Sequence, residues 1–271
     1  MILSDIGALT WTVRIVSFAL VLQTIEFLML KESYGEKWIW DWEIIRRDYE
    51  LFPKAIRLFL DLFLRNPNFT YLLFFRLTCS FALFLAPFPI PLGFVVFLFL
   101  TTILISLRWR GTFNGGSDFM NLIVLAALSV AAAFPSSMKV RVGCLWYISL
   151  QACTSYFVAG FSKLKTKNWR TGEALKGFFS SGIYEMSFGL HQVSKRKWLL
   201  IISSWALILF ECTFPLALLN PQVCLILLVF GLCFHLGAFY AFGLNRFVFA
   251  WLATYPALFY CSGLGAGSFA N

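Results

Sequence analysis

Residues 156–175 read YFVAGFSKLKTKNWRTGEAL, and the change of character within this stretch indicates a membrane protein. Its first part, residues 156–161, ends a long apolar run. Four cations and an indole then follow in quick succession: Lys163, Lys165, Lys167, Arg170 and Trp169. An apolar segment that delivers lysines to the membrane boundary suits either an anchor among lipid headgroups or a reactive site.

The composition of the whole chain agrees with membrane insertion. The 271 residues are 60% hydrophobic and 19% aromatic, and only 13% carry a charge. Soluble domains are roughly half apolar and about a quarter charged. The polar surface is therefore too small to cover a water-soluble globule, and an integral membrane protein in contact with the lipid bilayer is expected. The formal charge of +9 is interpreted as membrane topology rather than as binding of nucleic acid.

About 20 apolar residues are needed for a helix to cross the hydrocarbon core. On that measure the fold class is all-α, a polytopic transmembrane helical bundle of about eight spans within a single domain, residues 1–271. The predicted spans are 6–30, 69–86, 92–107, 119–134, 142–161, 199–219, 223–243 and 247–263. Proline residues separate the second span from the third, and Asn220-Pro221 separates the sixth from the seventh.

The basic residues predict the orientation of these spans. Eighteen of the 22 lysines and arginines fall in loops that an eight-span arrangement places on one side. Lys139 and Arg141 alone fall in loops on the other side. The positive-inside rule assigns the richer side to the cytoplasm, so both termini are predicted to be non-cytoplasmic.

Two connections on the basic side are long. Residues 31–68 contain apolar positions at helical spacing opposite Arg57, Asp61 and Arg65, which predicts an interfacial amphipathic helix. Packing on the membrane is favoured there over partner binding. Residues 162–198 form the long loop on the cytoplasmic side, and its final basic run is interpreted as a topogenic anchor.

Charged groups inside spans need a partner because their insertion costs about 2.5–3.5 kcal/mol each. Glu26 and Arg76 lie at matching depths, so an interhelical pair is plausible. Glu211 and His235 lie near the middles of successive antiparallel spans. A carboxylate beside an imidazole can transfer protons, and the same pair can also act only as a polar clasp between helices.

Lys163 is open to two interpretations. It lies one turn beyond the membrane end of its span, where a desolvated amine can act as a base or nucleophile. A snorkelling anchor, like Lys165 and Lys167, is the alternative. No metal site is expected, since the chain has only two histidines and no zinc-ligand spacing. The seven cysteines lie in apolar runs without a CxxC pair and are interpreted as small buried hydrophobes.

Several of these blocks together resemble the HTTM (horizontally transferred transmembrane) domain family. This family includes the membrane domain of the vitamin K-dependent gamma-carboxylase and its bacterial relatives. The blocks are Gly115-Gly116-Ser117-Asp118 before a span, Tyr156 to Leu164 followed by Trp169, Gly172 and Glu173, and Glu211, Pro215, His235 and Phe247 in the late spans.

The resemblance implies a role for particular residues. The lysine that precedes leucine in the family signature is taken as the base that deprotonates reduced vitamin K, and by position this is Lys163. A reduced quinone is therefore the implied cofactor. Arg76, Glu26, Asp118 and Trp169 are expected to be ligand-binding or structural polar residues.

Two functions from different classes remain open at this point. The first is an inner-membrane enzyme or peptide-maturation subunit that binds a quinone or lipid, with Lys163 as base and Glu211 and His235 as proton-handling groups. Its partner would be a peptide or a thiol-redox protein. The second is a non-catalytic membrane scaffold, or an accessory subunit of a larger complex, whose charged residues only hold helices together.

Overall fold

The computed structural model describes residues 3–30, 40–109, 115–180 and 195–268. Within these ranges the regular structure is helical throughout, which confirms the all-α prediction. The chain divides into two compact units, residues 5–144 and residues 145–271 with the first four residues. The boundary falls inside one helix, α7 (Met138–Lys165).

Seven helical stretches are long and apolar enough to cross a membrane, counted over the described residues. They are Asp5–Met29, Asn68–Leu85, Gly116–Ala133, Met138–Lys165, Lys197–Leu218, Pro221–Phe242 and Asn245–Leu264. The predicted span at 92–107 forms a shorter apolar helix, α5 (Leu92–Arg108), of 17 residues. At a rise of 1.5 Å per residue, it extends about 25 Å, slightly less than a typical hydrocarbon core.

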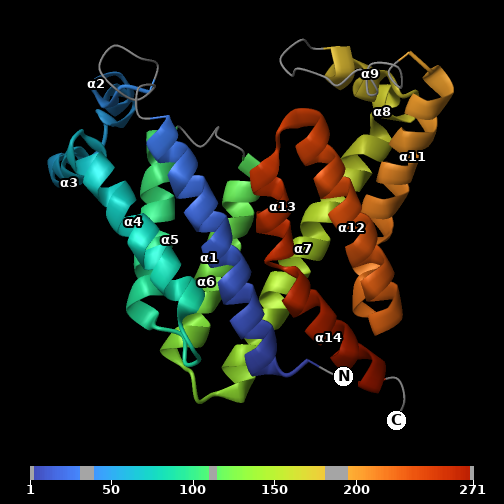
Figure 1. Cartoon of the computed structure of the whole chain (residues 1–271). Helices are drawn as coiled ribbons and strands as arrows, with labels where there is room; N and C mark the ends of the chain where they lie inside the picture. The colour runs from blue at the N-terminus through green and yellow to red at the C-terminus, as the bar shows by residue number, and fades with distance from the viewer. Residues whose placement is uncertain (1–2, 31–39, 110–114, 181–194, 269–271) are drawn as a thin grey trace. The chain divides into compact units, whose positions relative to one another are not determined.

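Apolar helices form most of the unit of residues 5–144 (Figure 1). They are α1 (Asp5–Met29), α4 (Asn68–Leu85), α5 and α6 (Gly115–Ala133). α1 packs along α4, and α5 packs along α6. At the start of α7, Arg141 forms a buried ion pair with Asp5, with 2.7 Å between Nε and Oδ2. Arg141, expected from sequence to be a loop cation, therefore ties α7 to the first turn of α1.

A compact helical segment lies where α1 ends and α4 begins (Figure 1). It comprises α2 (Trp42–Ile45), the 3-10 helix η2 (Arg46–Tyr49) and α3 (Lys54–Leu64). Leu60 and Leu64 of α3 are buried in a cluster with Trp42 and Trp109. The predicted helix is thus present and has one face packed on the unit. Its position flat in a membrane interface stays a prediction, and residues 31–39 lie outside the described residues.

Arg108, at the end of α5, fixes the C-terminus of α3. Its guanidinium is fully buried, donates to the Leu64 carbonyl and lies 4.3 Å from the centroid of the Phe69 ring. The last carbonyls of a helix lack partners within the helix, so a cation there stabilises the helix end.

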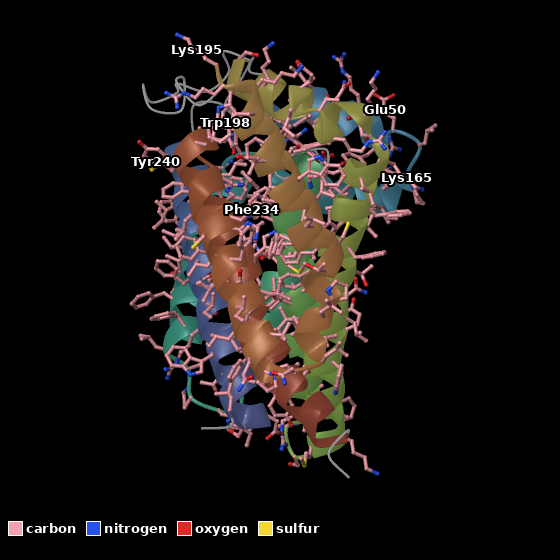
Figure 2. All side chains as sticks on the ribbon, turned by 90° about the vertical axis from the view of Figure 1, so that its right-hand side faces the viewer. Glu50, Lys165, Lys195, Trp198, Phe234 and Tyr240 are labelled. Atoms are coloured by element: carbon pink, nitrogen blue, oxygen red, sulfur yellow. The ribbon has the colours of Figure 1, made fainter. Side chains whose placement is uncertain are left out.

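The unit of residues 145–271 contains the second half of α7 and the helices that follow it. These are α8 (Lys167–Arg170), α9 (Glu173–Ser180), α11 (Lys197–Thr213), η3 (Phe214–Leu218), α12 (Pro221–Phe242), α13 (Asn245–Leu252) and α14 (Tyr255–Ser268). The predicted loop at 162–198 thus contains two short helices, and residues 181–194 with His191 lie outside the described part. Lys165 and Lys195 lie toward one end of this unit, whereas Phe234 lies further along the bundle (Figure 2).

The turn between η3 and α12 forms where the sequence indicated it. Asn220 caps α12, its side chain accepting from the Gln222 backbone N–H at 2.7 Å, and Pro221 takes the first helical position. Proline has no N–H to leave unpaired there, and its fixed φ suits the first turn. The helix ends at Gly243, whose φ of 66° is the left-handed conformation that favours glycine. This hairpin sets the depth of His235 in α12.

Candidate functional site

The site begins with a close approach between α7 and α11 at Gly160. A Cβ at Gly160 would stand only 2.7 Å from both the Glu211 Cβ and the Cys212 backbone nitrogen. The two helices therefore pack with no side chain of α7 between them at this level, a close contact that small residues permit in membrane bundles. As a result, Glu211 lies about one turn from Lys163.

Lys163 and Glu211 form a buried ion pair. The Lys163 ammonium lies 2.7 Å from one Glu211 carboxylate oxygen and 2.6 Å from the other. Its side chain is 18% exposed, and that of Glu211 is 4% exposed. The short distances are typical of charge-assisted hydrogen bonds. Lys163 thus points at a carboxylate within the helices rather than out toward lipid headgroups.

The chain that follows α7 folds back along α11. Trp169, in α8, stands beside the pair, with the Lys163 ammonium 5.2 Å from its ring centroid. The Trp169 carbonyl accepts a hydrogen bond from the Ser204 hydroxyl of α11. Gly172 has a φ of 78°, and a Cβ there would lie 3.0 Å from the Leu200 Cβ. Four residues of this stretch therefore contact α11 one after another: Gly160, Lys163, Trp169 and Gly172. Their shared contact with one helix is a physical reason for these residue types to occur together.

The other lysines of the opening stretch have different surroundings. Lys165 is exposed, and its ammonium lies 4.3 Å from the centroid of the Phe161 ring. Lys167 is exposed as well. Both positions fit surface cations, whereas Lys163 is held inside.

A second polar pair lies deeper along α7. The Tyr156 hydroxyl is 2.7 Å from Nε2 of His235, and each residue is only 3% exposed. Tyr156 precedes Lys163 by seven residues, or two helical turns, so both side chains lie on one face of α7. The two pairs are therefore about 10 Å apart along the helix.

Aromatic rings enclose the Tyr156–His235 pair. The centroid of the Phe214 ring lies 3.9 Å from that of Tyr156, and the Trp251 ring lies 4.3 Å from Tyr156. Trp251 also stacks on His235 at 5.5 Å with 16° between the ring planes. A Cβ at Gly231 would stand 2.7 Å from the Tyr255 hydroxyl and 3.5 Å from that of Tyr156. The absence of a side chain at Gly231 thus lets two tyrosine hydroxyls meet beside the histidine.

Two buried polar atoms in this aromatic cluster have no hydrogen-bond partner within the described part of the chain. They are Nδ1 of His235 and Nε1 of Trp251. Leaving a buried polar group unpaired costs about 1–3 kcal/mol. Oxygen atoms of a bound molecule would satisfy both of these nitrogen atoms.

The expected Glu211–His235 pair is replaced by two others. Glu211 bonds Lys163 of α7, and His235 bonds Tyr156 of α7. Counting from the hairpin turn predicts the depth of each residue along its helix. Depth does not determine in which direction around the helix axis a side chain points. The sequence analysis assigns no role to Tyr156, Trp251 or Tyr255. For Tyr156 two signals are present: it begins the block that resembles the family signature, and it lies seven residues before Lys163.

The remaining polar candidates lie in the unit of residues 5–144. Arg76 is fully buried, and its guanidinium donates to the side chains of Gln23 at 3.0 Å and Thr102 at 3.0 Å. The amide of Gln23 in turn donates to Asp118 at 2.6 Å. Gln23 thus connects Arg76 and Asp118, two of the expected polar residues. For Glu26, which is half-buried, a pair with Arg76 stays a prediction.

Comparison with known proteins places these residues in a family. The HTTM domain model matches residues 125–262, about half of the chain, and this range includes Lys163, Glu211 and His235. No curated protein and no solved structure matches the chain. The chain is an integral membrane protein of the HTTM family.

Proposed function

We propose that the protein is a membrane enzyme, or the membrane subunit of one, that takes a proton from a hydroxyl of an apolar ligand such as a reduced quinone. Lys163 and Glu211 are the proton-handling pair. The observation that carries the proposal is the buried ion pair, with both carboxylate oxygens within 2.7 Å of the ammonium. Buried, mutually dependent ionisable pairs are more common at functional sites than elsewhere.

The pair can take up a proton without creating an isolated charge. In a medium of low dielectric, a proton can move along the 2.6 Å bond from the Lys163 nitrogen to the Glu211 oxygen, which leaves a neutral amine and a neutral acid. The amine then takes the proton of the ligand hydroxyl. After both proton transfers, Lys163 is an ammonium again and Glu211 is a protonated carboxylic acid. The new ammonium lies beside the ligand oxygen, and its charge stabilises the negative charge there.

The aromatic cluster supports an oxygen-bearing, flat ligand as the partner of this pair. Tyr156 and His235 supply a hydrogen-bonded pair two turns from Lys163, and Nδ1 of His235 is unpaired within the described residues. A reduced quinone supplies the acidic hydroxyl and the reducing electrons when it is bound. Tyr156 and His235 would orient the ligand. An inner-membrane location and a peptide or thiol-redox partner belong to the same proposal.

A scaffold role is the second candidate, and one observation favours it. Gly160, Lys163, Trp169 and Gly172 all contact α11, so the signature is also what a helix-packing device requires. On this reading, Lys163 and Glu211 only hold α7 against α11. A test of function must therefore separate loss of chemistry from loss of packing.

The proposal is tested with Lys163→Ala and, as a matched control, Lys165→Ala, which removes an exposed lysine two residues away. Detergent-purified protein is mixed with a short-chain reduced naphthoquinone under air, and formation of quinone and hydrogen peroxide is followed. We expect wild type and Lys165→Ala to accelerate oxidation, and Lys163→Ala to lose about 10²–10⁴-fold. Equal rates for folded Lys163→Ala and wild type would refute the role of Lys163. No acceleration by wild type would refute the choice of ligand.

A further inference from the structure

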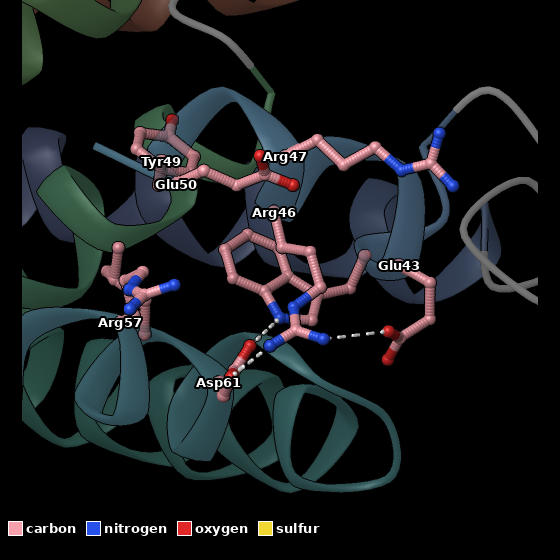
Figure 3. Close-up of a pocket in the computed structure, with 9 residues that line it drawn as sticks. Glu43, Arg46, Arg47, Tyr49, Glu50, Arg57 and Asp61 are labelled. Carbon is pink, nitrogen blue, oxygen red and sulfur yellow. Dashed lines mark hydrogen bonds and ion pairs between the residues drawn. The ribbon is translucent and has the colours of Figure 1, made fainter. Parts of the chain in front are cut away.

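A pocket of about 580 Å³ lies between the α2–η2 segment and α3, far in sequence from the ion pair (Figure 3). Its volume is within the range of small-molecule sites. Trp42, Arg46, Arg47 and Glu50 line it from the α2–η2 side, and Arg57 and Asp61 line it from α3. Charged side chains thus enter the pocket from two elements.

The inner part of the pocket is held by a closed hydrogen-bond network. Asp61 accepts from the Trp42 indole at 2.7 Å and from the Arg46 guanidinium at 2.8 Å. Arg46 also contacts Glu43 at 3.3 Å (Figure 3). Trp42 itself is buried. These groups are satisfied by one another, so they form a fixed wall rather than the ligand-binding groups.

Three side chains that line the pocket do not belong to this hydrogen-bond network. Within the described ranges, the side chains of Arg47, Arg57 and Glu50 have no hydrogen-bond or ion-pair partner, and all three are exposed. Figure 3 shows Arg47 and Arg57 on opposite sides of the paired Arg46 and Asp61. Two guanidiniums and one carboxylate therefore remain available. This combination complements a ligand with a phosphate and an ammonium group, because guanidinium binds phosphate oxygens and carboxylate binds ammonium.

The helix that carries Arg57 has an apolar face next to the pocket. Leu58 and Leu62 of α3 are 58% and 57% exposed, and Leu51 just before the helix is 98% exposed. Around the axis of α3, Leu58 and Leu62 lie about 100° from Arg57 and Asp61, respectively, so the two leucines form the neighbouring face of the helix. In a membrane protein, such residues are covered by acyl chains. A molecule in this pocket would thus have its polar part among the charges and its apolar part along α3.

We propose that this pocket binds the headgroup of an amine-bearing phospholipid, of the phosphatidylethanolamine type. The phosphate binds Arg57, the ammonium binds Glu50, and an acyl chain lies along Leu58 and Leu62. Arg47 adds a positive charge at the other side of the pocket (Figure 3). The proposal is independent of the reaction at Lys163.

The test is lipid retention by the full-length protein in detergent, counted by native mass spectrometry. The probes are phosphatidylethanolamine and phosphatidylglycerol with identical acyl chains, each added at a fixed ratio. We expect the Arg47→Ala, Arg57→Ala double variant to retain phosphatidylethanolamine about tenfold less well than wild type, since the charge-assisted contact of Arg57 and the positive charge of Arg47 are both lost. The matched control is Lys165→Ala, Lys167→Ala, which removes two exposed cations elsewhere and should retain the lipid as wild type does.

Two further variants sharpen the result. Glu50→Gln removes only the carboxylate and should abolish the preference for phosphatidylethanolamine over phosphatidylglycerol. Arg47→Lys, Arg57→Lys keeps the charge and should restore part of the binding, which separates a folding defect from loss of recognition.

Several outcomes would overturn the proposal. Equal retention of phosphatidylethanolamine by wild type and the arginine double variant would show that the lipid does not bind at this pocket. An equal loss in the lysine control would show that general surface charge attracts the lipid. Displacement of the lipid by inorganic phosphate alone would point to a free-anion site, and a Glu50→Gln variant with unchanged preference would refute the ammonium contact.

Discussion

At the scale of single residues, the glycines of the signature have as clear a role as its lysine. Gly160 is buried at the point where α7 meets α11, and nothing larger fits between its Cα and the α11 backbone. The contact brings Glu211 within reach of Lys163. The ion pair therefore depends on a residue that has no chemistry of its own.

Gly160→Ala is expected to destabilise the protein by about 1–3 kcal/mol, because the new methyl group would overlap backbone atoms of α11. Gly143→Ala on the same helix is the control, since a Cβ there meets nothing within 4 Å. Alanine is the better helix former, so this control should be neutral or stabilising by up to about 1 kcal/mol. Thermal unfolding of both variants in one detergent gives the comparison. Equal midpoints for the two variants would contradict the close approach.

At the scale of elements, the sequence predicted where helices lie better than which way their side chains face. The spans at 69–86 and 223–243 agree with α4 and α12 to within two residues at each end. Long apolar runs, proline punctuation and capping residues are local signals, and these are enough to place a helix. The short helices α8 and α9 were missed because they are polar and brief, so hydropathy does not reveal them.

Side-chain partners were predicted less well, for a physical reason. Two residues at matching depth in adjacent helices can face each other or face away, and a single sequence does not give the rotation of a helix about its axis. Glu211 was expected to meet His235 but bonds Lys163, and Arg76 bonds Gln23 and Thr102. The surroundings of Lys163 and Lys165 do differ, since Lys163 is paired with Glu211 and Lys165 is exposed, whereas the catalytic role of Lys163 stays a prediction.

At the scale of the whole molecule, the chain's basic residues make a clear prediction of orientation. A cysteine placed at Lys165 should be labelled by a membrane-impermeant maleimide only from the cytoplasmic side, because the loops rich in lysine and arginine stay there. A cysteine placed at Lys139 is the matched reporter for the other side. The seven native cysteines give a background of labelling, which is measured on the parent protein without an introduced cysteine. Labelling of the Lys165 position from outside intact cells would reverse the orientation.

The two compact units divide the roles suggested for this protein. The HTTM match covers most of the unit that contains the ion pair and the aromatic cluster. The charged pocket between α2–η2 and α3 lies in the other unit, outside the matched residues. The proposed chemistry and the proposed lipid recognition can therefore be tested separately, and variants in one unit serve as controls for the other.

The central claim is that Lys163 and Glu211 perform chemistry and do more than hold two helices together. The most direct measurement is a comparison of Lys163→Glu, Glu211→Lys and the double exchange for both stability and quinol oxidation. Each single variant leaves two like charges together, so both should unfold easily, and the double exchange should recover most of the stability because it restores an ion pair. We predict that the double exchange does not recover activity, since the amine then comes from α11 and no longer has the position that it has on α7. Recovery of activity together with stability would contradict the claim and assign the pair to packing alone.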